Sequence, residues 1–189
     1  MQKFSVLIPS YKEKRRLYAL IERVLRDRQS SKIDRIIVVT PDKNLKRPKS
    51  KKVLFVEERK RRGKCVAIRE GLKKIRTKIV VMLNSDTRMP ENFLHFLLMH
   101  FENPNVGMVV GRPIADKNSK IYPFSQIILD LHHFLLLKEP KGAEICAFRK
   151  IFNHFPKVVA DEVFIEYMIR KKGFSIVYEP RAYGYVKAP

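Results

Sequence analysis

Four short polar segments stand directly after apolar, β-branched runs, and a fifth begins a predicted helix near the end of the chain. Carboxylates at such places can hold a divalent cation or accept a proton, and cations beside a glycine can bind a phosphate. These segments are therefore the candidates for a catalytic site. They are Pro9–Glu13, Thr40–Asp42, Glu57–Lys64, Asn84–Thr87 and Asp161–Glu162.

Asp86 is the candidate metal ligand. It lies in the segment Asn84-Ser85-Asp86-Thr87, just past the apolar run Ile79–Leu83. A carboxylate on a tight turn can hold a hard divalent cation that keeps several waters and bridges the phosphates of a ligand. Asp is also an ordinary turn residue, so the alternative is that Asp86 caps a helix that starts near Pro90.

Arg62-Gly63-Lys64 is the candidate phosphate-binding segment. It precedes a predicted helix, whose first-turn N–H groups and dipole favour an anion, and Gly63 allows the backbone to approach that anion closely. The alternative is that Glu57–Lys64, which contains five cations, is only a solvated run of charges. The pattern GxxxxGK[ST] of a Walker A loop is absent from the sequence.

Asp161 and Glu162 are the candidate general bases. They open the last predicted helix, where the helix dipole stabilises negative charge. A carboxylate there could take the proton from an acceptor hydroxyl as the hydroxyl attacks a sugar carbon. The alternative is a helix cap followed by a surface glutamate, and the residues alone do not choose between the two.

The histidines and cysteines form no metal or nucleophile motif. His95 and His100 are five residues apart, so the HExxH spacing is missing, and core or surface roles are expected for the histidines. Cys65 and Cys146 each have apolar neighbours and stand far apart in the chain. We expect both to be reduced, buried thiols.

The elements that position these segments follow an alternating pattern. Short β-branched runs predict strands, and apolar residues at helical spacing predict helices between them, which together indicate an α/β fold with a mostly parallel sheet and helices on both faces. In such sheets the ligand binds at the carboxyl ends of the strands. The predicted strands are Phe4–Ile8, Ile36–Val39, Val53–Val56, Ile79–Leu83 and Val106–Val110.

The second half of the chain shows a different pattern from about residue 113. A polar loop, an amphipathic helix over Phe124–Leu137 and a strand over Gly142–Phe148 are predicted first. A helix over Asp161–Lys172 should then end at Gly173, a favourable C-cap residue, and a closing strand over Phe174–Tyr178 should follow it. This half is expected to cover one edge of the ligand cleft.

Size and charge limit the function classes. The chain has 189 residues, of which 45% are hydrophobic, so one domain is expected, and its net charge of +21 must attract polyanions. No leader or membrane-spanning segment is recognised, so we expect a cytoplasmic protein, with the inner face of an anionic membrane as a further location. The stretch Phe124–Leu137 could contact such a membrane, or could instead be core or a dimer face.

The candidate segments together resemble family 2 glycosyltransferases of the GT-A fold. The resemblance is collinear and covers nearly the whole chain. Its parts are Val6–Glu13, similar to the opening strand and P-[ST]-Y-N-E turn with Lys12 in place of Asn; Arg62–Leu72, similar to R-G-K-x-x-A-x-x-x-G-L; Ile79–Pro90, similar to the strand and DxD segment; Gly142–Arg149, similar to an acceptor-side strand; and Asp161-Glu162 before Gly173, similar to the ED motif.

The resemblance implies roles for individual residues. It implies a single GT-A domain over residues 1–189, with a Rossmann-like sheet, a nucleotide-sugar-binding half at 1–112 and an acceptor-binding half at 113–189. It also implies an inverting transfer of a sugar from a UDP- or GDP-sugar, assisted by Mg²⁺ or Mn²⁺. The residues concerned are Pro9, Tyr11, Glu13, Asp42, Arg62, Lys64 and Ser85 for the donor, Asp86 for the metal, and Glu162 with Asp161 for catalysis.

Three departures from the family pattern matter. Only Asp42 of Thr40-Pro41-Asp42 could meet the nucleoside, and the metal motif is Asn84-Ser85-Asp86 in place of two aspartates. The QxxRW segment of processive enzymes is missing, which favours transfer of a single sugar over polymer synthesis. The acceptor, a sugar or a lipid-linked molecule, is left open.

Two other functions stay open. The charge of +21 is compatible with a nucleic-acid-binding protein, although the cations are spread along the chain without a recognised binding motif, so no specific nucleic-acid partner is expected. A sugar-phosphate nucleotidyltransferase would also use an α/β nucleotide site.

Overall fold

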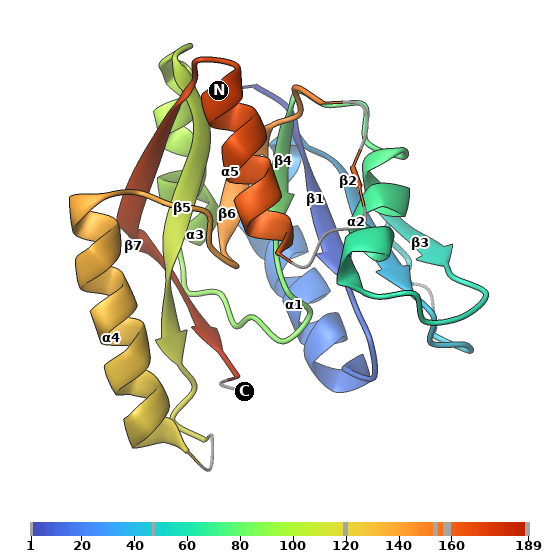
Figure 1. Cartoon of the computed structure of the whole chain (residues 1–189). Helices are drawn as coiled ribbons and strands as arrows, with labels where there is room; N and C mark the ends of the chain where they lie inside the picture. Colours follow the sequence, from blue (N-terminus) through green and yellow to red (C-terminus); the bar gives the residue numbers. More distant parts are fainter. Residues whose placement is uncertain (1, 47, 119–120, 153–154, 157–159, 188–189) are drawn as a thin grey trace.

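The computed structural model describes residues 2–46, 48–118, 121–152, 155–156 and 160–187. Strands and helices alternate through most of this length, as the sequence predicts (Figure 1). In chain order the elements are β1 (Phe4–Pro9), α1 (Lys14–Arg26), a short 3₁₀ helix (Ser30–Lys32), β2 (Ile33–Thr40), β3 (Val53–Glu57), α2 (Lys64–Leu72), β4 (Ile79–Met82), α3 (Phe93–Met99), a second 3₁₀ helix (His100–Glu102), β5 (Val106–Ala115), α4 (Tyr122–Lys138), β6 (Cys146–Arg149), α5 (Asp161–Lys171) and β7 (Ser175–Val186).

The strands form one mostly parallel sheet in the order β3-β2-β1-β4-β6-β5-β7. Only β6 runs antiparallel to its neighbours β4 and β5 among the described pairings. Because β1, β2, β3 and β4 are parallel, their carboxyl ends meet at one edge of the sheet. The polar segments that follow these strands are thereby brought together.

Helices cover both faces of the sheet, which confirms the predicted arrangement. α2 and α5 lie in front of the sheet in Figure 1, and their apolar side chains join one buried cluster with Leu7, Val80 and Phe148. α1 and α3 pack on the other face, around Phe4 and Val81. β1 and β4 are therefore buried along their whole length, as their continuous apolar runs require.

Several elements are longer than their predicted spans. The sequence predicted a loop from about residue 113, but β5 continues to Ala115 because its last residues pair with Tyr183–Val186 of β7. β7 itself reaches Val186, well past the predicted end of the closing strand. Pro113 is tolerated in β5 because β6 pairs only with Met108–Val110, so no partner on that side needs the missing N–H.

The end of α5 follows its prediction closely. The helix ends at Lys171, and Gly173 has φ +78°, a left-handed conformation that favours glycine.

The predicted boundary between the two halves of the chain, at residue 112, falls within β5. β6 belongs to the second half of the chain and lies between β4 and β5 in the sheet. The two halves thus share one sheet.

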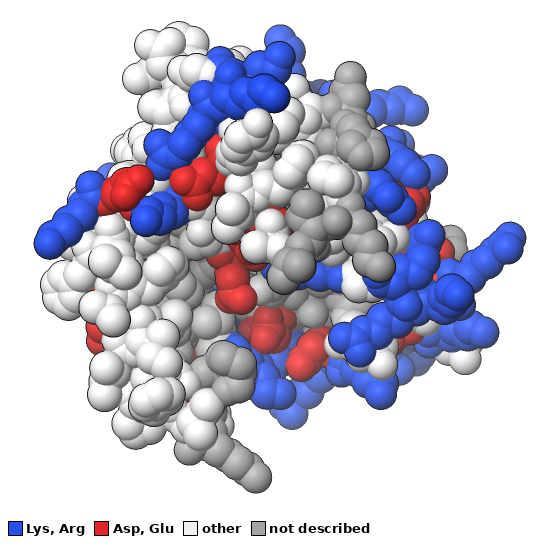
Figure 2. All heavy atoms as spheres, viewed as in Figure 1, with Lys and Arg blue, Asp and Glu red and all other residues white. Residues whose placement is uncertain are grey.

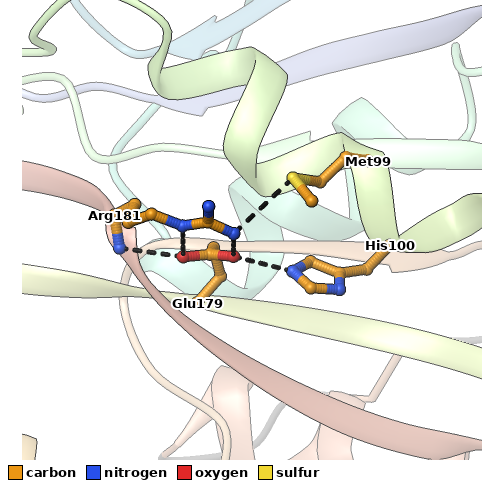
Figure 3. Close-up of polar contacts among 4 residues, drawn as sticks. All are labelled: Met99, His100, Glu179 and Arg181. Atoms are coloured by element: carbon orange, nitrogen blue, oxygen red, sulfur yellow. Dashed lines mark hydrogen bonds and ion pairs between the residues drawn. The ribbon is translucent and has the colours of Figure 1, made fainter.

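An ionic cluster around a buried carboxylate ties β7 to the end of α3 (Figure 3). Glu179 is buried, and its carboxylate accepts two hydrogen bonds from the Arg181 side chain, at 2.8 and 2.7 Å, and a third from the Arg181 backbone N–H. His100 Nε2 lies 2.8 Å from the second oxygen. Hydrogen bonds from Arg181 and His100 lower the pKa of Glu179 to about 2. His100 therefore has a structural contact, as expected of the histidines.

Candidate active site

A cavity of about 290 Å³ opens at the carboxyl ends of β1, β2 and β4. Each predicted polar segment of the first half contributes to its wall, because the parallel strands end at the same edge of the sheet. We call it the donor cavity. Its lining residues are Pro9, Ser10, Tyr11, Glu13, Pro41, Glu58, Arg61, Gly63, Lys64, Ala67, Asn84, Ser85 and Asp86.

Asp86 lies in the turn after β4 and faces the donor cavity. The alternative that it caps the next helix is wrong, since α3 begins at Phe93 and its N-cap residue is Asn92. Burial, together with the negative charge of Glu13, raises the pKa of Asp86. A cation at this place would stabilise the carboxylate, so the residue fits a metal ligand electrostatically.

The surroundings of Asp86 suit an ion that is shared with a ligand. No group of three or more His, Cys, Asp or Glu side chains that could hold a metal occurs among the described residues. Asn84, Ser85 and Asp86 supply oxygen atoms of the kind that Mg²⁺ and Mn²⁺ accept, and such ions often take one or two carboxylates plus substrate phosphates and water. The residues therefore fit a metal that binds together with a phosphate-bearing donor.

The N-terminal end of α2 borders the donor cavity through Gly63 and Lys64. Gly63 has φ +95°, a backbone conformation that residues other than glycine rarely adopt, and the space where a Cβ would stand is open. The helix dipole adds positive potential at this end. Gly63 and Lys64 thus lie at the cavity, where the sequence predicted a phosphate site. Arg62 was predicted there as well, but it does not line the cavity.

Lys64 joins the donor cavity to the carboxylates of α5. Its Nζ lies 2.7 Å from Glu162 Oε1 and 3.1 Å from Asp161 Oδ2, across 98 residues of sequence in the first case. Burial alone would lower the pKa of Lys64, but Asp161 and Glu162 outweigh it and raise this pKa. The side chain therefore stays a cation between two acids.

Neither carboxylate serves as the helix cap that the sequence left open. The N-cap residue of α5 is Ala160, and no side chain caps the helix. Asp161 is buried, and burial raises its pKa, while the charge of Lys64 acts in the opposite direction. Glu162 is the more accessible of the two, with 16% of its side chain exposed against 5% for Asp161.

A second depression, of about 270 Å³, lies on the other side of Glu162. We call it the acceptor depression, after the half of the chain that contributes its walls. Glu144 lines it with an exposed side chain, whose pKa is raised by partial desolvation and by the charges of Glu162, Asp86 and Asp161. Its lining residues are Pro113, Leu129, His132, Gly142, Ala143, Glu144, Glu162 and Val163.

Tyr11 presents its ring at the mouth of the donor cavity. The Arg61 guanidinium lies over this ring, 4.4 Å from its centre, and the Lys12 ammonium lies 5.3 Å from it. A planar ring with cations around it can stack on a nucleobase and attract the phosphates beside it. Lys12 has φ +58°, and its backbone N–H donates a 2.7 Å hydrogen bond to Asp42.

Two predicted donor residues do not line the cavity. Asp42 holds the turn of Lys12, as described above, which accounts for its position near the site. Arg62 lies 3.4 Å from the buried Glu58, while its neighbour Arg61 takes the place at the cavity. Pro9, Tyr11, Glu13, Lys64 and Ser85 are at the cavity as predicted.

Several residues at the site were not selected from the sequence, and four of them carry a charge or an amide. Glu58 and Arg61 stand in the charge run 57–64, where one cation or acid could not be told from the next. Asn84 was only part of the metal segment. Glu144 had one signal, since it is the single acid inside the otherwise apolar stretch Ala143–Phe148.

Charge is unevenly distributed over the face that carries both cavities (Figure 2). Acidic side chains run across the middle of this face, and Lys and Arg side chains cover much of its right side. Acidic side chains thus lie beside a strongly basic surface on this face. Such a surface attracts a polyphosphate, and the central acids can then bind the cation that accompanies it.

Comparison with known proteins agrees with this geometry. The family model described as glycosyl transferase family 2 matches residues 5–175. Among curated proteins, the poly-beta-1,6-N-acetyl-D-glucosamine synthases of Staphylococcus aureus (strain COL) and Staphylococcus epidermidis are similar, with 22% identity over 151 residues and 24% over 150. The matches cover 72% and 71% of this chain but only 37% and 36% of those synthases.

A solved structure shares the fold over nearly the whole chain. It is the mannosyltransferase PcManGT from Pyrobaculum calidifontis in complex with GDP-Man and Mn²⁺, with a TM-score of 0.71 and 18% sequence identity. The match covers 99% of this chain and 57% of that one. This likeness confirms the predicted α/β fold of GT-A type.

Proposed function

Because the chain belongs to glycosyl transferase family 2, we propose that it transfers a single sugar from a nucleoside-diphosphate sugar to an acceptor hydroxyl, with inversion at the anomeric carbon. The observation that carries this proposal is the Lys64 contact described above. One cation lies at the wall of the donor cavity and also pairs with Glu162, which faces the acceptor depression. Donor and acceptor would thus meet at this ion pair.

The donor cavity suits a nucleoside diphosphate. Tyr11 and Arg61 offer a surface on which a base can stack, and Gly63 with Lys64 offers a cationic helix end for phosphates. The mannosyltransferase of similar fold holds GDP-Man. GDP-mannose is therefore the first donor to test, with UDP-sugars as the second.

Asp86 is the residue that we propose to hold Mg²⁺ or Mn²⁺, with Asn84 and Ser85 beside it. When bound there, the ion would neutralise the negative charge that develops on the diphosphate leaving group. The structure of similar fold contains Mn²⁺, which supports this assignment. The protein's own contribution is a partly buried carboxylate whose pKa is raised by burial and by the charge of Glu13, so that a bound cation would stabilise its charged form.

Glu162 is the proposed general base. It is more accessible than Asp161, lies in the acceptor depression, and is oriented by Lys64. As the acceptor oxygen forms its bond to the anomeric carbon, the bond from that carbon to the diphosphate breaks, and the hydroxyl proton moves to Glu162. Asp161, which is buried behind it, is proposed to position Lys64 and Glu162.

Single-sugar transfer stays a prediction, as does the division of labour between residues 1–112 and 113–189. The chain spans little more than a third of the length of the curated relatives that it matches, and these relatives are polymer synthases. The absence of a QxxRW segment supports the transfer of one sugar. A peripheral membrane location and the lack of a specific nucleic-acid partner are likewise predictions.

Calorimetric titration with GDP and UDP, each with and without Mn²⁺, tests the donor and metal parts of the proposal. We expect one nucleotide to bind with Mn²⁺, and we expect Asp86→Asn to weaken this binding by about 10-fold or more, since a metal-bound carboxylate is lost. Glu162→Gln is the matched control, because it should leave nucleotide binding intact. If neither nucleotide binds in the presence of metal, the proposal is wrong.

A further inference from the structure

The outward side of α4 is apolar along its length. Eight of the eleven exposed large apolar side chains among the described residues lie within 121–137. Six of them recur at helical spacing and form one continuous stripe, about 17 Å long at the rise of an α-helix. This outer stripe consists of Phe124, Ile127, Ile128, Leu131, Phe134 and Leu135, which are between 50% and 67% exposed.

Polar contacts hold the opposite side of α4 against the sheet. The Arg112 side chain donates a 3.0 Å hydrogen bond to Asp130, and the Ala115 backbone N–H donates to Gln126. His133 Nδ1 lies 2.6 Å from the hydroxyl of Tyr178 on β7. These contacts fix the rotation of the helix, so its apolar side chains cannot turn inward.

This distribution is the reverse of an ordinary surface helix, which buries its apolar stripe. In Figure 1, α4 stands at the outer edge of the sheet beside β5 and β7, and the same region of Figure 2 is largely free of charged side chains. A contiguous apolar surface of this kind normally marks a contact with a protein or a membrane. The core and dimer alternatives from the sequence can now be weighed, and core is excluded by the exposure of the stripe.

Charge favours a membrane over a second copy of the chain. Two chains with a net charge of +21 each repel one another, whereas an anionic bilayer attracts each of them. The exposed cations Lys117, Lys138 and Lys141 also flank the two ends of α4 in the sequence. Long cationic side chains at the ends of an apolar helix can reach lipid phosphates while the apolar residues enter the bilayer.

We propose that the outer stripe of α4 inserts into the interfacial region of an anionic lipid bilayer. No helix among the described residues is long and apolar enough to cross a membrane, so α4 would lie in the plane of the interface. Its inner residues Leu129 and His132 line the acceptor depression. Membrane contact through α4 therefore brings this depression, together with Glu162, to the lipid surface.

Flotation with lipid vesicles tests the proposal without any substrate, so its outcome does not depend on the proposed transfer. Vesicles of phosphatidylcholine alone are compared with vesicles that also contain phosphatidylglycerol, at low and at moderate salt. We expect binding to the anionic vesicles and a much weaker association with neutral ones. The triple variant Ile127→Gln, Leu131→Gln and Phe134→Gln should lower the partition coefficient roughly 100-fold, because three apolar side chains no longer enter the lipid.

Neutral glutamine keeps the net charge at +21, so the variant isolates the apolar contribution. The matched control replaces the same residues by apolar ones, Ile127→Leu, Leu131→Met and Phe134→Leu, and should bind vesicles like the wild type. Equal binding of the glutamine variant and the wild type would overturn the proposal in favour of charge alone. So would a dimer, seen by light scattering, that binds no vesicles and that the glutamine variant dissociates.

Discussion

Two ionic clusters of this protein, each containing a buried carboxylate, have opposite balances of charge. At the site, one cation, Lys64, serves both Asp161 and Glu162, and burial raises the pKa of Asp161. In the cluster of Figure 3, one carboxylate, Glu179, receives hydrogen bonds from Arg181 and His100, and these lower its pKa to about 2.

The difference distinguishes a structural cluster from a chemical one. Glu179 has more donors than it needs, so its charge is held and its proton affinity is low. At the site two carboxylates share one cation, and burial raises the pKa of Asp161, so the charged form of this acid is held less firmly. Two acids that are withdrawn from water and share one cation are costly for folding, and catalysis is a reason for a protein to retain them.

Glu162→Gln should give the largest effect. We expect the rate of sugar transfer to fall by roughly 10² to 10⁴-fold, because the amide cannot accept the acceptor proton. The melting temperature should stay the same or rise, since one of two like charges near Lys64 is removed. Asp161→Asn is the matched variant and should cost less activity; a larger loss for Asp161→Asn would exchange the two roles. Transfer assays and thermal unfolding measure both.

Glu179→Gln should act on stability and leave activity unchanged. Removing the charge weakens the bonds to Arg181 and His100, which should lower the free energy of unfolding by about 2 kcal/mol. At this chain length that corresponds to a drop in melting temperature of roughly 4–8 °C. Glu139→Gln, which removes an exposed ion pair with Lys141, should change stability by less than about 0.5 kcal/mol. If both variants have the same melting temperature, the Glu179 cluster contributes no more to stability than an exposed ion pair does.

Gly142→Ala should reduce activity by about 10-fold, a cost of the size expected when catalytic geometry shifts slightly. A Cβ at Gly142 would stand 2.4 Å from the Glu162 carbonyl oxygen, so the first turn of α5 must move. Gly107→Ala is the control, because its Cβ would stand equally close to Phe174, away from the site. It should lower the melting temperature but retain the transfer rate of the folded fraction. Similar activity losses for both variants would contradict this distinction.

Acid titration should show the smallest effect. Because the pKa of Glu179 is lowered from its ordinary 4.5 to about 2 on folding, its stabilisation is present above pH 4.5 and is lost as the pH falls toward 2. Burial raises the pKa of Asp161, so protonating this residue acts in the opposite direction and relieves a cost of folding. Chemical unfolding between pH 6 and pH 2 should therefore depend less on pH in Glu179→Gln than in the wild type. An unchanged slope would show that other acids dominate.

Much of the fold could be predicted from local patterns. The apolar runs of β1 and β4 predict strands, and the helical spacing of apolar residues predicts α1. These local patterns are informative because the side chains that each element buries recur with the period of that element. The extension of β5 to Ala115 could not be predicted, since it depends on pairing with β7, some 70 residues later. Strand ends are set by partners, and a local pattern does not show them.

The site was predictable where a backbone signal accompanied the charge. Gly63 before Lys64, and Asp86 after a buried strand, stand at positions that parallel-sheet geometry brings together. Arg61 and Arg62 could not be distinguished, because their assignment depends on which of two adjacent side chains meets Glu58. The contact between Lys64 and Glu162 spans 98 residues, and no local pattern reveals it.

The place of β6 between β4 and β5 has a consequence for synthesis on the ribosome. Until residues 146–149 emerge, the hydrogen-bonding edge of β4 that will pair with β6 stays open. An open apolar edge invites pairing with other chains, and such late, long-range closure slows folding. During synthesis, β1–β4 can therefore pair before β6 is available, and the edge of β4 stays exposed in this interval. We expect chaperones to bind the nascent chain at this stage.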